Sequence, residues 1–235
     1  MTPDESAAPA TGGPAYPQVV LATNNAKKLT ELRRVLAEAA PAVEVLGLAD
    51  LPSYPEPAET EPTFEGNALL KARACVEATG LASLADDSGI CVDVLNQMPG
   101  VRSARWSGVR ATDADNNELL LRQLEDVPDE RRGASFVCAM ALVLPDGREH
   151  VRRGEMPGRL IGELRGHNGF GYDAMFVPEN AELTTGELSA AEKDAISHRG
   201  KAVRAIVGVL VEELQMLADH APEDHELKDT ELDTR

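Results

Sequence analysis

An acidic cluster, Ala85-Asp86-Asp87-Ser88-Gly89, follows an apolar run in the first half of the chain. A carboxylate at the end of a strand can bind magnesium and can orient or deprotonate a water molecule. Because neighbouring residues on an extended segment point to opposite faces, we expect only one of Asp86 and Asp87 to enter a cleft. An acidic turn before Gly89 is the alternative interpretation.

A second cluster, Thr23-Asn24-Asn25-Ala26-Lys27-Lys28, stands between an apolar run and a segment with helical periodicity. The unpaired N–H groups at the start of a helix form an anion site with the positive end of its dipole. Thr and Asn side chains add hydrogen bonds, and the lysines add charge. The GxxxxGK[ST] spacing of a P-loop is absent. An ordinary turn with a solvated lysine pair is the alternative.

Two clusters in the second half suit a planar ligand and an anion. In Gly169-Phe170-Gly171-Tyr172-Asp173 the glycines allow close backbone approach, an aromatic ring could stack on a base, and Asp173 or a backbone N–H could read the edge of the base. Lys193 and Ser197-His198-Arg199-Gly200 gather cationic side chains that suit a phosphate or a base carbonyl. The alternatives are aromatic packing in a strand and a basic patch at a helix end.

Three loop carboxylates precede Thr63, namely Glu56, Glu59 and Glu61. If the loop folds over Asp87, one of them could be a second metal ligand; otherwise they are solvated. Taken together, the clusters supply a phosphate cradle, a metal carboxylate, an aromatic site of the size of a base and a second group of cations. This combination suggests a nucleotide polyphosphate ligand.

Alternating strands and helices must position these clusters. We expect helices over about 26–39, 63–79 and 112–125, and a helical stretch that starts at a capping box at 189–192, resumes after Gly200 and ends near Leu217. The expected strands are 18–23, 43–48, 81–85, 90–95, 134–144, 148–154 and 169–177. This alternation, with one long hairpin, predicts an α/β fold with a mixed sheet.

Composition limits the function classes. The 235 residues suit one α/β domain or two lobes around a cleft, and the formal net charge of −17 disfavours duplex DNA and membrane surfaces as partners. The three dispersed cysteines argue against a disulfide framework or a zinc site. The N-terminus lacks the pattern of a signal peptide, so we expect a cytoplasmic protein. We predict a disordered leader at 1–17, a catalytic domain at 18–217 and an acidic disordered tail at 218–235.

Six stretches, spread over about residues 18–215, resemble the inosine-triphosphate pyrophosphatase family of non-canonical purine nucleoside-triphosphate pyrophosphatases. They are 21–28, 63–68, 85–89, 99–108, 169–173 and 192–201. The resemblance implies two lobes around an elongated mixed β-sheet with a central nucleotide-binding cleft, and a homodimer. It also implies magnesium-dependent hydrolysis of ITP, dITP or XTP to the monophosphate and pyrophosphate.

The resemblance also assigns roles to residues. Asp87 would be the catalytic base and a magnesium ligand, and Glu59 would share the metal. Two departures bear on the metal: Gly66 stands where many relatives have Glu, and Ala58 replaces the first residue of an acidic pair. The substrate would contact Thr23, Asn24, Asn25, Ala26, Lys27, Lys28, Ser88, Phe170, Gly171, Tyr172, Asp173, Lys193, His198 and Arg199. A nucleotide-binding regulatory protein without turnover, whose acidic tail engages a partner, is the alternative.

Overall fold

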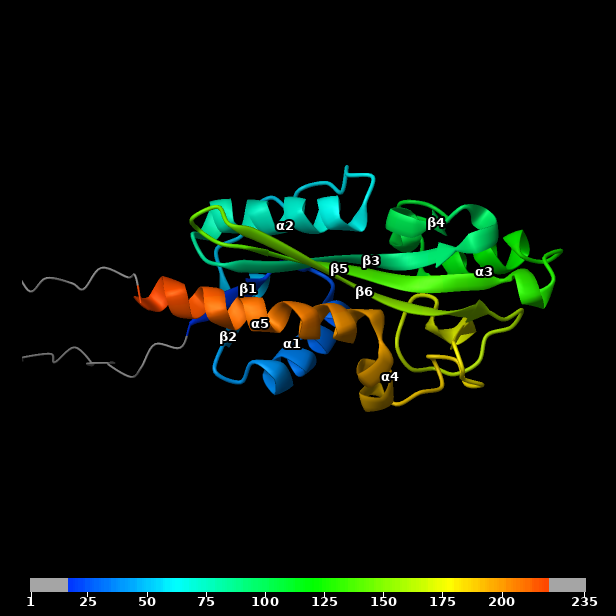
Figure 1. Cartoon of the computed structure of the whole chain (residues 1–235). Helices are drawn as coiled ribbons and strands as arrows, with labels where there is room; N and C mark the ends of the chain where they lie inside the picture. Colours follow the sequence, from blue (N-terminus) through cyan, green and yellow to red (C-terminus); the bar gives the residue numbers. More distant parts are fainter. Residues whose placement is uncertain (1–16, 220–235) are drawn as a thin grey trace, which may run out of the picture.

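A mixed β-sheet runs the length of the molecule and carries helices on both faces (Figure 1). The computed structural model describes residues 17–219. The strand order is β2-β1-β3-β5-β6-β7, and β4 pairs with β3. β1 pairs in parallel with β2 and β3, and the other pairings are antiparallel. The strands are β1 (Gln18–Leu21), β2 (Glu44–Gly47), β3 (Ser83–Val92), β4 (Met98–Pro99), β5 (Gly133–Val143), β6 (Glu149–Leu160) and β7 (Phe176–Pro178).

Four helices begin directly after a residue whose side chain caps them. Asn25, Thr63, Thr112 and Ser189 each accept a hydrogen bond from a backbone N–H of the first turn that follows. The last helix starts at His198 and not after Gly200, and it ends two residues beyond Leu217. The helices are α1 (Ala26–Ala39), α2 (Phe64–Thr79), α3 (Asp113–Gln123), α4 (Ala190–Ile196) and α5 (His198–Asp219). Short 3₁₀ turns cover Leu48–Asp50, Asp93–Leu95, Gly100–Arg105, Asp129–Arg131 and Asp173–Met175.

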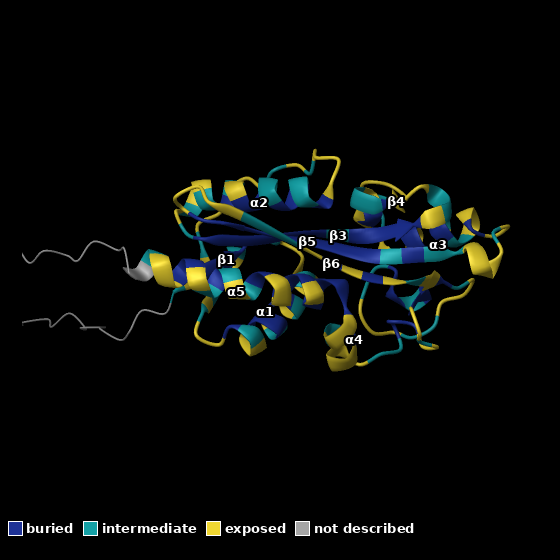
Figure 2. Cartoon of the chain, viewed as in Figure 1, coloured by how far each residue is buried: buried dark blue, intermediate teal, exposed yellow. Residues whose placement is uncertain are grey.

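Three apolar clusters divide the core into two lobes. In the first lobe α2 packs on one face of the sheet, and α1 and α5 pack on the other (Figure 1). In the second lobe, at the far end of the long strands, residues of α3 such as Leu120 pack with Phe136 and Phe176. Strands β3 and β5 pass through both lobes and are buried along almost their whole length (Figure 2). The predicted α/β architecture of two lobes around an elongated mixed sheet is therefore confirmed.

The prediction of two strands at 81–85 and 90–95 was wrong. One strand, β3, continues through Asp86 and Asp87, because every one of its residues from Ser83 to Val92 pairs with β5. The acidic sequence is therefore part of a strand and not a turn. The tertiary pairing outweighs the turn preference of Asp, Ser and Gly.

The prediction of a strand at 169–177 was also wrong over most of its length. Gly169 and Gly171 have φ of 74° and 63°, which is the left-handed region and does not fit a strand. The segment is a loop followed by a 3₁₀ turn, and only β7 is extended. The hairpin strand predicted at 148–154 continues to Leu160.

Two of the predicted regions fall wholly or largely outside the described residues. Residues 1–16 of the predicted leader are outside, as are 220–235 of the predicted tail; 218 and 219 belong to α5. Between residues 17 and 219 there is no helix with the length and apolarity needed to span a bilayer.

Gly154 on β6 sets how closely α5 approaches the sheet. A Cβ at this buried position would lie 2.0 Å from the carbonyl oxygen of His198 and 2.6 Å from the backbone nitrogen of Ala202. Gly154→Ala must therefore displace the start of α5, and we expect it to lower the free energy of unfolding by about 1–3 kcal/mol, as overpacking does. Urea denaturation measures this change.

Gly208→Ala is the matched control, because Gly208 lies within α5 and a Cβ there meets nothing within 4 Å. That substitution should stabilise the helix by up to about 1 kcal/mol. If Gly154→Ala and wild type unfold at the same urea concentration, the close packing of β6 against α5 is not as described.

Candidate active site

A pocket of about 460 Å³ collects most of the predicted site residues. Ala26 and Lys27 begin α1 beside the pocket but do not line it. The predicted residues in its lining are Thr23, Asn24, Asn25, Lys28, Glu59, Asp87, Ser88, Phe170, Gly171, Tyr172, Asp173, Lys193, His198 and Arg199.

A gap in the sheet exposes the middle of β3 to this pocket. On the edge of β3 opposite β5, β1 pairs only at Ser83 and Leu84, and β4 pairs only at Cys91 and Val92. Between them Asp87, Ser88 and Gly89 line the pocket. A ligand can therefore reach groups on both faces of the strand from its open edge.

Asp86 and Asp87 have opposite environments, as expected for adjacent residues of a strand. Asp86 is buried, with the Lys28 ammonium 3.0 Å and Arg199 Nε 3.7 Å from its carboxylate. Burial alone would raise the pKa of Asp86, but the charges of Lys28 and Arg199 outweigh it and hold the pKa well below its usual range. Asp86 is therefore an ionised anchor for two cations and does not line the pocket.

Asp87 lines the pocket and is poised to exchange a proton. Its Oδ2 accepts a hydrogen bond of 3.0 Å from Asn67 Nδ2, and its Oδ1 lies 3.9 Å from Lys71 Nζ. Burial raises the pKa of Asp87 to about 6; Lys71 opposes this shift, and the charge of Glu59 adds to it. A carboxylate with a pKa close to neutral pH is suited to general base catalysis.

Glu59 reaches the same part of the pocket from the loop before α2. It accepts hydrogen bonds from Lys71 Nζ at 3.2 Å and Arg105 Nη1 at 2.6 Å. Burial would raise the pKa of Glu59, but Arg105 and Lys71 outweigh it and lower the pKa. The Lys71 ammonium thus lies between the two carboxylates predicted to share a metal.

The donor set fits magnesium only in part. Within residues 17–219, no group of three or more His, Cys, Asp or Glu side chains could hold a metal ion. Magnesium in nucleotide enzymes commonly uses one or two carboxylates together with substrate phosphates and water. Asp87 and Glu59 match that pattern. The space that a side chain at Gly66 would need is taken by Glu61, whose Cβ would lie 2.7 Å from the added Cβ.

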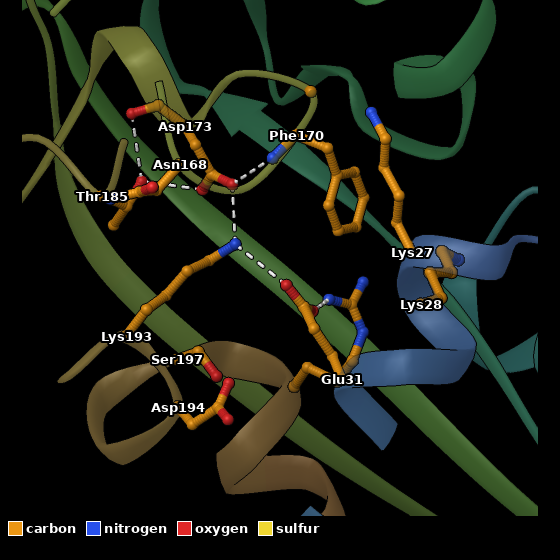
Figure 3. A network of polar contacts seen from close by, with 12 residues as sticks. Lys27, Lys28, Glu31, Asn168, Phe170, Asp173, Thr185, Lys193, Asp194 and Ser197 are labelled. Atoms are coloured by element: carbon orange, nitrogen blue, oxygen red, sulfur yellow. Dashed lines mark hydrogen bonds and ion pairs between the residues drawn. The ribbon is translucent and has the colours of Figure 1, made fainter. Parts of the chain in front are cut away.

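An ion-pair network joins α1, α4, α5 and the loop before β7 (Figure 3). Lys193 Nζ lies 2.6 Å from Asp173 Oδ2 and 3.2 Å from Glu31 Oε1. Glu31 also binds Arg199 through its second oxygen. Asp173 accepts further hydrogen bonds from the Phe170 backbone N–H at 2.8 Å and from Thr185 Oγ1 at 2.8 Å. The network fixes the two cations against the loop that carries Phe170.

Of the two aromatic residues in that loop, only Phe170 is placed to stack on a ligand. Its ring centroid lies 5.5 Å from Lys27 Nζ, 5.2 Å from Lys193 Nζ and 5.5 Å from Arg199 Cζ. Tyr172 is only 3% exposed, packs in the second lobe and donates its hydroxyl to the Ser103 carbonyl at 2.9 Å.

His198 stacks on Phe136, with ring centroids 4.9 Å apart and an interplanar angle of 11°. Burial, and then the charges of Arg199 and Lys193, lower the pKa of His198 well below its usual value. The imidazole is therefore neutral at physiological pH. It can donate or accept a hydrogen bond in the pocket, but it adds no positive charge.

The interpretation of the sequence missed several site residues, which are Glu31, Asn67, Lys71, Arg105 and Asp113. One signal was available for Lys71 and Asn67, which lie one turn apart on the face of α2 that also carries Phe64, Ala68, Ala72 and Cys75. A lysine and an asparagine on an otherwise apolar buried face need polar partners. Asn67 donates a hydrogen bond to Asp87, and Lys71 forms an ion pair with it. Glu31 and Asp113 gave no such signal, and Arg105 stands in the 99–108 stretch but was assigned no role there.

Known proteins are similar to this chain in fold and sequence. Residues 19–209 match the model of the Ham1 family. The chain is 57% identical over 200 residues to a dITP/XTP pyrophosphatase of Cutibacterium acnes, covering 84% of this chain and 98% of that one. A crystal structure of a nucleoside-triphosphatase / dITP/XTP pyrophosphatase from Mycobacterium abscessus is 54% identical with a TM-score of 0.68, covering 80% of this chain and 98% of that one. A HAM1 protein from Coxiella burnetii is 40% identical with a TM-score of 0.75, covering 83% and 98%. The chain belongs to the Ham1 family.

Proposed function

We propose that the protein hydrolyses non-canonical purine nucleoside triphosphates such as ITP, dITP and XTP to the monophosphate and pyrophosphate. The observation that carries the proposal is Asp87, a carboxylate with a pKa of about 6 at the open edge of β3, in a pocket that also contains Lys28, Lys71 and Arg199. The names of the chain's relatives support the same reaction.

In this reaction the base stacks on Phe170, and the triphosphate extends toward Lys28 and Lys71. Asp87 orients a water molecule and accepts its proton as the water oxygen attacks the α-phosphorus. The bond between the α-phosphorus and the bridging oxygen breaks, and pyrophosphate leaves. Positioning and charge neutralisation by the cations provide most of the catalysis.

Magnesium is the proposed cofactor, with Asp87 and Glu59 as its protein ligands. When bound, it would neutralise charge on the phosphate oxygens. Lys71 and Arg105 already hold the Glu59 carboxylate, and the Lys71 ammonium also lies 3.9 Å from Asp87 Oδ1, so both proposed ligands border the same part of the pocket. The homodimer, the cytoplasmic location and the absence of nucleic-acid or membrane partners stay predictions.

Discrimination between bases follows from hydrogen bonds at position 6 of the purine. A 6-oxo group accepts where a 6-amino group donates, so the wrong base leaves a buried donor unpaired. Each lost bond costs about 1–3 kcal/mol. We therefore expect ITP to be strongly preferred over ATP.

The purified protein should release IMP and pyrophosphate from ITP in magnesium, with ATP largely spared. Equimolar ITP and ATP are incubated separately, and the monophosphate and pyrophosphate are quantified by chromatography; the same reactions in EDTA test the need for magnesium. Equal rates on both substrates would show that the pocket does not select 6-oxo purines. Tight ITP binding without pyrophosphate release would instead favour the nucleotide-binding regulatory protein.

A further inference from the structure

Helix α3 holds both backbone polar groups of Gly171 in the base loop, defined here as residues 169–173. The Gly171 N–H donates to Asp113 Oδ2 at 3.0 Å, and Asn117 Nδ2 donates to the Gly171 carbonyl at 2.9 Å. Asp113 and Asn117 are four residues apart, so they lie on the same face of the helix. We call this pair of contacts the α3 clamp.

The base loop needs such external support. The left-handed φ values of Gly169 and Gly171 keep it out of the sheet, and the pairing of β6 with β7 begins only at Phe176. A Cβ at Gly171 would meet nothing within 4 Å, so side-chain packing does not restrain the backbone there. Phe170 and Tyr172 on either side have their own contacts, with Asp173 and Ser103, whereas the N–H and carbonyl of Gly171 itself are held by the two hydrogen bonds from α3.

Asp113 also connects the base loop to the other lobe. The same Oδ2 that accepts from Gly171 lies 3.2 Å from Lys27 Nζ, and that ammonium lies 5.5 Å from the Phe170 ring centroid. Its neighbour Lys28 is instead paired with Asp86. The two adjacent lysines thus have separate partners, and Lys27 is the one that joins the start of α1 to the base loop.

We propose that Asp113 and Asn117 are positioning residues that set the selectivity of the pocket between nucleobases. The identity of the ligand, a 6-oxo purine nucleotide, rests on the function proposed above. Hydrogen bonds discriminate between bases only when the groups that make them are held within a fraction of an ångström. Loosening Gly171 therefore weakens binding of the matching base and has little effect on a base that is already mismatched.

Asp113→Ala and Asn117→Ala should each lower the ratio of kcat/KM for ITP to that for ATP by about tenfold, the effect of losing one well-placed discriminating bond. Asp113→Asn keeps an acceptor for the Gly171 N–H and removes only the charge facing Lys27, so it should restore the ratio to within about threefold of wild type. Glu118→Gln is the matched control, because Glu118 is exposed on the same helix and its carboxylate lies 3.9 Å from Arg122 on that helix, away from the base loop.

A second measurement separates this inference from the proposed reaction. Calorimetric titration of ITP and of ATP in EDTA gives an affinity ratio that needs no turnover, and thermal unfolding shows whether each variant is folded. A fall in the affinity ratio for both alanine variants, with recovery in Asp113→Asn, supports the clamp. Equal losses for ITP and ATP, or a wild-type protein that binds both equally, overturn it. Selective binding without hydrolysis refutes the proposed reaction and leaves the clamp standing.

Discussion

Asp87→Asn should lower kcat for ITP by about 10³- to 10⁴-fold while the protein stays folded. A positioned general base contributes about 10²–10⁴-fold, and the same change removes one of the two proposed metal ligands. Asparagine keeps the shape of the side chain and can still accept the hydrogen bond from Asn67. Pyrophosphate release at saturating ITP and magnesium measures the loss.

The same variant should be more stable than wild type above about pH 6. The pKa of Asp87 is raised from 3.8 to about 6, so ionised Asp87 opposes folding, and stability is lost as pH rises through about 6. Asp87→Asn carries no such charge. At pH 8 in EDTA, urea denaturation should therefore give it a free energy of unfolding about 1–3 kcal/mol higher than that of wild type. Asp126→Asn, the same change at an exposed position, should alter neither quantity. If Asp87→Asn keeps a tenth or more of the wild-type kcat, Asp87 is not the general base.

Helix starts were predictable because their chemistry is local. Thr63, Thr112 and Ser189 each bond to a backbone N–H three residues ahead, and Asn25 does so two and three residues ahead. All the atoms involved lie within one short stretch of sequence. The predicted anion site at the start of α1 rests on the same local argument, and that helix does begin beside the pocket.

The open edge of β3 was not predictable, because it depends on where two other strands stop. Asp-Asp-Ser-Gly has the composition of a turn, and only the pairing with β5 makes it a strand. The gap opposite exists because β1 ends its pairing at Leu84 and β4 begins its pairing at Cys91. No local feature of residues 86–89 encodes either limit.

Contacts between residues that are distant in sequence were likewise not predictable. Lys193 was predicted as a ligand-binding cation, but its partners Glu31 and Asp173 are far from it along the chain and on different elements. Tyr172 was predicted as a possible stacking ring; it lines the pocket, but it is buried with the core of the second lobe and its hydroxyl bonds to the Ser103 carbonyl. Residue types therefore indicated which side chains could do chemistry, and the tertiary fold decided which of them line the pocket and which hold others in place.

Asp86→Ala should lower the free energy of unfolding by about 3–5 kcal/mol, the cost of breaking a buried ion pair by removing one partner. The change leaves Lys28 and Arg199 facing a site without its counter-charge, and Arg199 is only 3% exposed. Urea denaturation at pH 7 measures the loss. Asp129→Ala is the matched control, because Asp129 pairs with Arg132 at 3.2 Å but its side chain is 87% exposed. An exposed pair of this kind contributes at most about 1 kcal/mol.

The pH dependence adds a further test of the Asp86 assignment. Its pKa is held below the usual aspartate value in the folded protein, so its contribution to stability is present at neutral pH and is lost only in strong acid. The difference in stability between wild type and Asp86→Ala should therefore persist from pH 8 to pH 5. If the two proteins unfold together at pH 7, Asp86 does not anchor Lys28 and Arg199. A loss that appears only in activity would instead place Asp86 among the groups that face the ligand. The two neighbouring carboxylates are thus distinguished by the property that each controls, because Asp86 should control stability and Asp87 should control turnover.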